Sequence, residues 1–408
     1  AQLLGFYSGP GSQSPPTGIR TDSRRRHLLW LVDHHPDSAL LSLPEAAVNP
    51  SGQPLGDAEG YELLKKAWLD AAAKKDVNTI TLSNAARFFL LPDKALAAEF
   101  YGRARKLDPG NPAWMNAQAS MMAFALVGIT SVNQNGLPDP ADPKEAASEG
   151  ARSVGRDLEA SKDGELLIAV AGELMGRGAM AQAMARSKTG VKPAVDALAL
   201  AESYLQRADK LDPGKNAIHL GLARIYELRW MSAETEEDKK TLARARYEQL
   251  QRGMSGLHED DPASSAQVLN LARAAMDAGE LERAETLAKG LLALTPKIEV
   301  DPKLSRGVDD MRHHSFLILG RVALRRGDVD AAKADLLDAG RVGSGVMLAS
   351  LGPNMMLAKE LLEKGEKDVV LQYIGLCRRF WYFADRMTPW IVAIAKGEMP
   401  NFGDKLYH

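Results

Sequence analysis

Residues 266–296 read AQVLNLARAAMDAGELERAETLAKGLLALTP, and this stretch predicts two helices joined by a tight turn. Apolar and small residues recur three and four positions apart in each half, so each half has one apolar face. These positions are Val268, Leu271, Ala272 and Ala275 in the first half and Ala284, Ala288 and Leu291 in the second. Gly279 marks the turn, because glycine adopts the left-handed conformation at little cost. We expect Pro296 to end the second helix, because proline lacks the N–H group of a helix interior.

A second copy of this pattern follows after a short insert. Its first helix carries Phe316, Leu319, Gly320 and Ala323, its turn is Gly327-Asp328, and its second helix carries Ala332 and Leu336. The pattern resembles the tetratricopeptide repeat, which recurs about every 34 residues. The resemblance implies an all-α, right-handed solenoid of stacked helix-turn-helix hairpins with a binding or assembly role. It names no partner.

Similar hairpins are expected over most of the chain. Lys106–Gly110 and Lys210–Gly214 both read KLDPG, which indicates internal duplication. The segment 131–200 fits the pattern least well. The expected organisation is an extended tail (1–26), N-terminal helical repeats (27–130), irregular middle repeats (131–262), the best-matching repeats (263–341), a degenerate repeat with a capping helix (342–396) and an extended C-terminal tail (397–408).

Composition excludes several classes of function. The 408 residues include 51 basic and 53 acidic side chains, a formal net charge of −2, which argues against a dedicated nucleic-acid-binding protein. No apolar run reaches the ~18–20 residues that a membrane-spanning helix needs. Cys377 lies on an apolar stripe and is expected to be a buried structural residue.

The sequence contains no convincing catalytic or cofactor motif. Gly176–Ala181 matches a G-x-G-x-x-A string, but its flanks predict helix, whereas a dinucleotide fold needs a strand before it. The pairs His34-His35 and His313-His314 are poor metal ligands because neighbours on a helix point apart. Arg20 and the run 24–26 are interpreted as a solvated charge cluster. We therefore expect no enzyme, no cofactor and no metal.

The two tails suggest how the chain functions. The first 26 residues are rich in Gly, Pro and Ser, with Leu3, Leu4, Phe6 and Tyr7 as apolar anchors near the start. The chain begins at Ala1-Gln2, as it would after removal of a signal peptide, so we expect an exported protein, extracellular or periplasmic, with the cytoplasm as the alternative. Aromatic residues gather near both ends: Phe6, Tyr7, Trp381, Tyr382, Phe383, Trp390, Phe402 and Tyr407.

Two functions remain open. In the first, copies of the chain assemble head to tail into a ring or filament, with the N-terminal anchors on one side and Trp390, Phe402 and Tyr407 on the other. Core packing of the terminal cap is the alternative role for the last three. In the second, the chain is a monomeric adaptor that holds a peptide of another protein in its concave groove. Candidate groove residues on first helices are Asn84, Arg87, Asn270, Arg273 and Arg321.

Overall fold

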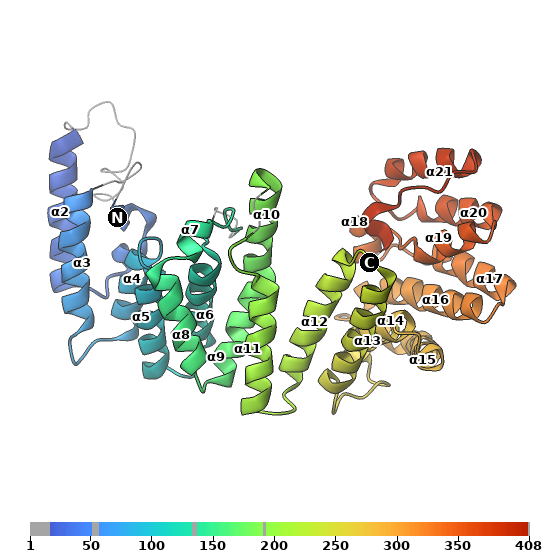
Figure 1. The fold of residues 1–408 in the computed structure, drawn as a ribbon, viewed down its shortest axis with the longest axis horizontal. Helices are drawn as coiled ribbons and strands as arrows, with labels where there is room; N and C mark the ends of the chain where they lie inside the picture. Colours follow the sequence, from blue (N-terminus) through green and yellow to red (C-terminus); the bar gives the residue numbers. More distant parts are fainter. Residues whose placement is uncertain (1–16, 51–56, 133–136, 191–192, 407–408) are drawn as a thin grey trace. The chain divides into compact units, whose positions relative to one another are not determined.

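The computed structural model of the chain describes residues 17–50, 57–132, 137–190 and 193–406. Over these residues the regular structure is helical, apart from one isolated bridge between Val132 and Pro138 (Figure 1). The expected all-α fold of stacked helical hairpins is confirmed. The chain divides into two compact units, residues 1–213 and 214–408.

The N-terminal unit contains four helix pairs: α2 with α3, α4 with α5, α6 with α8, and α9 with α11. The long insert between α6 and α8 includes the short helix α7, and a π-helical turn over Leu174–Gly178 joins α9 to α10. The bounds are α2 (Thr17–His34), α3 (Ala58–Ala72), α4 (Thr79–Phe89), α5 (Lys94–Leu107), α6 (Pro112–Val127), α7 (Pro143–Ala146), α8 (Glu149–Ala160), α9 (Gly164–Glu173), α10 (Ala179–Thr189) and α11 (Ala197–Leu211). The glycine string at 176–181 is therefore helical throughout.

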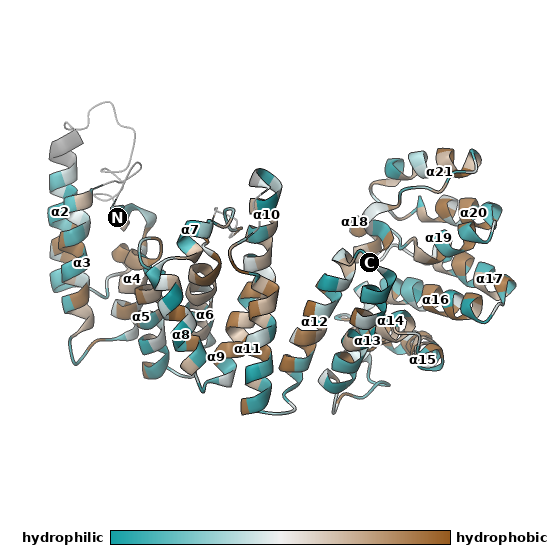
Figure 2. Ribbon diagram, in the orientation of Figure 1, coloured by the Kyte–Doolittle hydropathy of each residue, from teal (hydrophilic) through white to brown (hydrophobic). Residues whose placement is uncertain are grey.

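The C-terminal unit repeats the same plan in the pairs α12 with α13, α14 with α15, α16 with α17 and α19 with α20. Its bounds are α12 (Asn216–Ser232), α13 (Glu236–Gly253), α14 (Ser265–Asp277), α15 (Leu281–Glu299), α16 (Val308–Arg325), α17 (Val329–Arg341), α18 (Val346–Leu351), α19 (Met356–Glu363), α20 (Lys367–Cys377) and α21 (Thr388–Ala395). Most helices carry hydrophobic residues on one side and hydrophilic residues on the other (Figure 2).

The stretch 266–296 folds as its pattern predicts. Its apolar faces, on α14 and α15, lie in one buried cluster with residues of α12, α13 and α16. Gly279 has a φ of 81°, which is the left-handed conformation expected at the turn. Cys377 is buried, as expected.

Pro296 does not end its helix, contrary to the prediction, because α15 continues to Glu299. Proline at this position cannot donate to the carbonyl of Leu292, four residues earlier. The Thr295 hydroxyl donates to that carbonyl at 2.7 Å, so the acceptor keeps a partner and the helix passes through.

The expected tail 1–26 is shorter than predicted, because α2 begins at Thr17. The predicted solvated charge cluster is also wrong at two of its arginines. Arg24 is buried and donates to the main-chain carbonyls of Glu45 and Ala47, while Arg25 pairs with Asp57 at 2.6 Å. These long-range contacts hold α2 against the unit. The anchors Leu3, Leu4, Phe6 and Tyr7 lie outside the described residues.

The expected C-terminal tail also differs, because 397–406 folds back on its own unit. Residues Gly403–Leu406 form a 3₁₀ turn, and the main-chain N–H of Met355 donates to the carbonyl of Lys405 at 2.8 Å. The Phe402 side chain is buried in the same core as α19, α20 and α21. Burial of an apolar side chain such as that of Phe402 stabilises the fold, because it removes apolar surface from water.

Candidate interaction surfaces

The predicted groove residues Asn84, Arg87 and Asn270 differ in exposure and in the unit to which they belong. Asn84 is buried, and its amide nitrogen donates to the carbonyls of Pro36 at 2.9 Å and Ser38 at 3.1 Å. Its role is to fix the loop after α2, so its assignment to a binding groove is wrong. Arg87 is exposed on α4 and Asn270 on α14, in different units of the chain.

Arg273 and Arg321, in contrast, come together on the first helices of the C-terminal unit. Arg321 on α16 pairs with Asp277 of α14 at 3.0 Å and with Glu360 of α19 at 3.2 Å. Arg246 of α13 also pairs with Asp277, at 3.6 Å. Arg273 lies beside these groups in the same groove. We call this set of five residues the groove network.

Burial and charge set the electrostatics of the groove network. The side chains of Arg321, Asp277 and Glu360 are only 15%, 12% and 10% exposed. Burial alone lowers the pKa of Arg321, but the attraction of Glu360 and Asp277 outweighs it and raises the pKa above its ordinary value. Burial lowers the pKa of Arg273, and the like charge of Arg246 adds to that effect. The arginines therefore serve mainly to neutralise carboxylates of the same chain.

Side chains of the same unit also line this groove. Trp230 of α12, Met356 of α19 and Leu406 of the C-terminal segment border two spaces next to the groove network. The space beside Arg273 measures only about 40 Å³, whereas the one beside Arg321 and Glu360 measures about 550 Å³. The groove is therefore narrow at Arg273 and open at Arg321, where the charges are matched by side chains of the same unit.

Trp390 and Phe402 belong to the core of the C-terminal cap, so their assignment to an assembly contact is wrong. The rings of Trp381 and Trp390 stack at 5.9 Å, and Phe402 meets Trp390 edge-on at 5.2 Å. The indole N–H of Trp390 donates to the carbonyl of Asn401 at 3.0 Å. The third predicted contact residue, Tyr407, lies outside the described residues.

A different set of residues near the C-terminus does expose apolar surface. Tyr382 and Phe383 follow α20 and are 78% and 50% exposed. The main-chain N–H of Tyr382 donates to the carbonyl of Ala349 at 3.0 Å, which places this segment against α18. Three apolar side chains of α18 are also exposed: Val346, Met347 and Leu351. We call Val346, Met347, Leu351, Tyr382 and Phe383 the terminal patch; the aromatic run 381–383 is its only signal in the sequence.

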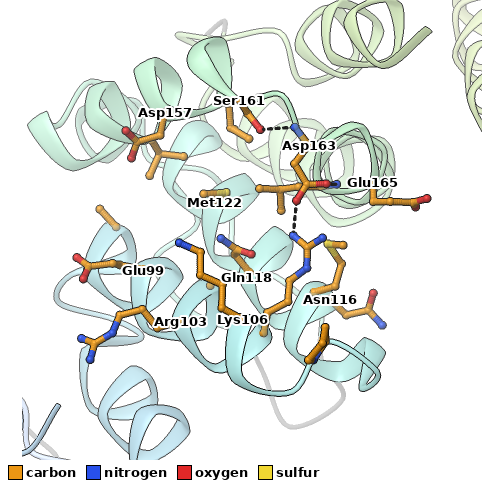
Figure 3. Close-up of a pocket in the computed structure, with 18 of the residues that line it drawn as sticks. Glu99, Arg103, Lys106, Asn116, Gln118, Met122, Asp157, Ser161, Asp163 and Glu165 are labelled. Atoms are coloured by element: carbon orange, nitrogen blue, oxygen red, sulfur yellow. Dashed lines mark hydrogen bonds and ion pairs between the residues drawn. The ribbon is translucent and has the colours of Figure 1, made fainter. Parts of the chain in front are cut away.

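The N-terminal unit contains a hollow of about 1310 Å³ between α5, α6, α8 and the start of α9 (Figure 3). Gln118 lies near the centre of its wall, next to Lys106 and Met122 in this view. Asp163, which pairs with Arg105 at 2.6 Å, lies at one side. Glu99 and Asp157 lie on the side of the hollow opposite Asp163 in this view.

Gln118 has an unsatisfied polar atom. The residue is 9% exposed, and its buried amide oxygen has no hydrogen-bond partner among the described residues. Gly102 makes room for this amide, because a Cβ atom at that position would lie 2.6 Å from Nε2. An unpaired buried acceptor costs about 1–3 kcal/mol. The repeat pattern did not indicate Gln118, because a missing hydrogen-bond partner cannot be seen in the sequence.

Among the described residues no group of three His, Cys, Asp or Glu side chains is placed to hold a metal ion. None of the described helices is both long and apolar enough to cross a membrane.

Comparisons with known proteins give fold similarity only. No protein-family model matches the sequence, and no curated protein matches it. Among solved structures, the human IFIT1 dimer with m7Gppp-AAAA is 14% identical, covering 83% of this chain and 76% of that chain, with a TM-score of 0.32. The APC/C hetero-tetramer Cut9-Hcn1 is 12% identical, covering 96% of this chain and 63% of that chain, with a TM-score of 0.27. These weak likenesses carry no functional argument, and the tetratricopeptide-like fold rests on the helix pairs described above.

Proposed function

We propose that the chain works through protein–protein contacts as a self-assembling structural subunit whose copies associate head to tail. The terminal patch is the observation that supports this proposal. The terminal repeats of a solenoid need a polar outer face to remain soluble. Here Tyr382, Phe383 and three apolar side chains of α18 are exposed, and a main-chain hydrogen bond joins the two segments. Exposed apolar clusters with aromatic residues are typical of protein interaction sites.

The N-terminal anchors supply the other half of the contact. In the proposal, Leu3, Leu4, Phe6 and Tyr7 of one copy cover the terminal patch of the next copy. Such a contact joins two different surfaces, so it closes into a ring or propagates as a filament. Export to the periplasm or the extracellular space is part of the proposal, and fractionation of native cells with an antibody to the chain would test it.

Light scattering after size exclusion, together with negative-stain microscopy, tests the assembly. We expect rings or filaments from the full chain at high micromolar concentration. They should be lost in the double variant Tyr382→Ser, Phe383→Ser and after deletion of residues 1–16. The control is Val300→Ser, which removes an exposed apolar side chain outside the terminal patch. A strictly monomeric full chain, or patch variants that assemble as the full chain does, would refute the proposal.

A second candidate function is a monomeric adaptor, and the Gln118 amide is the observation that favours it. The hollow exceeds the 300–1,000 Å³ typical of small-molecule sites, so a peptide segment is the better fit. In an extended peptide the N–H and C=O of one residue point to the same side, where they can pair with both atoms of a side-chain amide. Because the Gln118 oxygen is buried, this pairing requires the side chain to turn toward the hollow. Peptides selected from a random library should then bind at least tenfold more weakly to Gln118→Leu. Equal peptide binding by Gln118→Leu and the parent chain would refute the adaptor function.

A further inference from the structure

A second cavity of the N-terminal unit is smaller and largely apolar. It measures about 480 Å³ and lies between α2, α3, the end of α4 and the segment 41–49. Leu28 of α2, Leu64 and Trp68 of α3, and Phe88 of α4 contribute to its walls. Its volume is within the range of pockets that hold one small ligand. We call it the α2–α4 pocket.

The lining of the α2–α4 pocket is mostly apolar. Among the described residues that line it, Arg87 is the only charged one, and Ser42 and Asn49 are the two other polar ones. The Arg87 side chain is exposed, and no hydrogen bond or ion pair within the described residues engages it. A cation at the edge of an apolar cavity attracts a ligand that has an anionic group at one end.

A second cation lies behind one wall of the pocket. Arg24 is buried and donates to the carbonyls of Glu45 and Ala47, in the segment that forms one side of the pocket. Its Nε atom has no hydrogen-bond partner in the described structure, but its charge is offset in part by Asp57. No acidic side chain of the described residues lines the pocket itself. Arg87 is therefore the group that makes this apolar space favour an anion.

We propose that the α2–α4 pocket binds an amphiphile with an aliphatic chain and an anionic headgroup. The aliphatic chain of the ligand lies against Leu64, Trp68 and Phe88, and its headgroup pairs with Arg87 at the mouth of the pocket. The first 16 residues of the protein, AQLLGFYSGPGSQSPP, are a poorer occupant because they contain no acidic residue for Arg87. This site is separate from the terminal patch and does not depend on assembly.

Quenching of Trp68 fluorescence by 12-bromododecanoate, below its micelle concentration, tests the proposal. We expect saturable quenching that disappears in Trp68→Phe. The neutral competitor 1-dodecanol should displace the probe at least tenfold less effectively than dodecanoate. Arg87→Gln should abolish this preference and Arg87→Lys should retain it. The matched control is Arg26→Gln, which removes an exposed arginine of the same unit outside the pocket.

Three results would overturn the proposal: no saturable quenching, equal competition by dodecanol and dodecanoate, or unchanged preference in Arg87→Gln. Quenching that appears only after deletion of residues 1–16 would show that the chain's own N-terminus fills the pocket, and would also overturn it. A flotation assay with phosphatidylglycerol vesicles separates the sources of the ligand. Flotation that Arg87→Gln abolishes assigns the aliphatic chain to a lipid, and quenching without flotation assigns it to a free fatty acid.

Discussion

The groove of the C-terminal unit and the hollow of the N-terminal unit are built from the same kind of helix pair, yet their buried polar groups differ in whether they have partners. In the groove, Arg321 is matched by Asp277 and Glu360 of neighbouring helices. In the hollow, the Gln118 amide oxygen has no partner within the described residues. Position in the repeat therefore does not identify a binding surface here. Unpaired polar groups and exposed apolar groups are better indicators.

The largest expected effect tests whether the groove network is structural. Arg321→Ala leaves Asp277 and Glu360 buried with fewer counter-charges, and removing one partner of a buried ion pair costs about 3–5 kcal/mol. Urea unfolding measures this loss. Arg325→Ala is the matched control, because Arg325 also contacts Glu360, at 2.9 Å, but is 49% exposed. We expect a loss below about 1 kcal/mol there. Equal losses in the two variants would refute a structural role for the network.

Protonation of His313, which precedes a residue of the groove lining, gives the next largest effect. Burial lowers the pKa of His313 to about 4, and its Nδ1 atom lies 2.9 Å from the carbonyl of Ala339. The unfolded chain binds this proton near pH 6.5, so it carries more protons than the folded chain between pH 6.5 and 4. The contribution of neutral His313 is therefore complete above pH 6.5 and is lost as the pH falls toward 4, by about 3 kcal/mol.

Urea unfolding from pH 7.5 to 4.5 measures this loss. In His313→Asn the stability should change less over the same range, even though the variant starts from a lower stability at pH 7.5. The same slope in the variant and the parent chain would assign the acid sensitivity to other groups.

Local spacing accounts for what the sequence predicted well. The three- and four-residue periodicity of 266–296 defines the faces of α14 and α15, and the glycine at 279 defines the turn between them. These features depend on neighbours along the chain. The same reasoning placed Arg273 and Arg321 on first helices, where they do lie close together.

Contacts between distant segments account for what the sequence could not predict. Arg24 looked solvated because its acceptors are the carbonyls of Glu45 and Ala47. Phe402 was predicted to be a contact residue because the core that buries it is formed by the distant helices α19 to α21. The carboxylate of Glu360 that neutralises Arg321 is 39 residues away in the sequence. The sequence near each residue indicates neither these ion pairs nor the missing hydrogen-bond partner of Gln118.

The smallest expected effect compares two buried amides of the N-terminal unit. Asn84→Leu removes hydrogen bonds to the carbonyls of Pro36 and Ser38, and it should lower the free energy of unfolding by about 1–3 kcal/mol. Gln118→Leu removes an acceptor that has no partner, so it should leave this free energy unchanged or raise it by up to about 1 kcal/mol. Urea unfolding at pH 7.5 measures both. If Gln118→Leu costs as much as Asn84→Leu, the amide is already satisfied, and the hollow resembles the groove in having its polar groups matched within the chain.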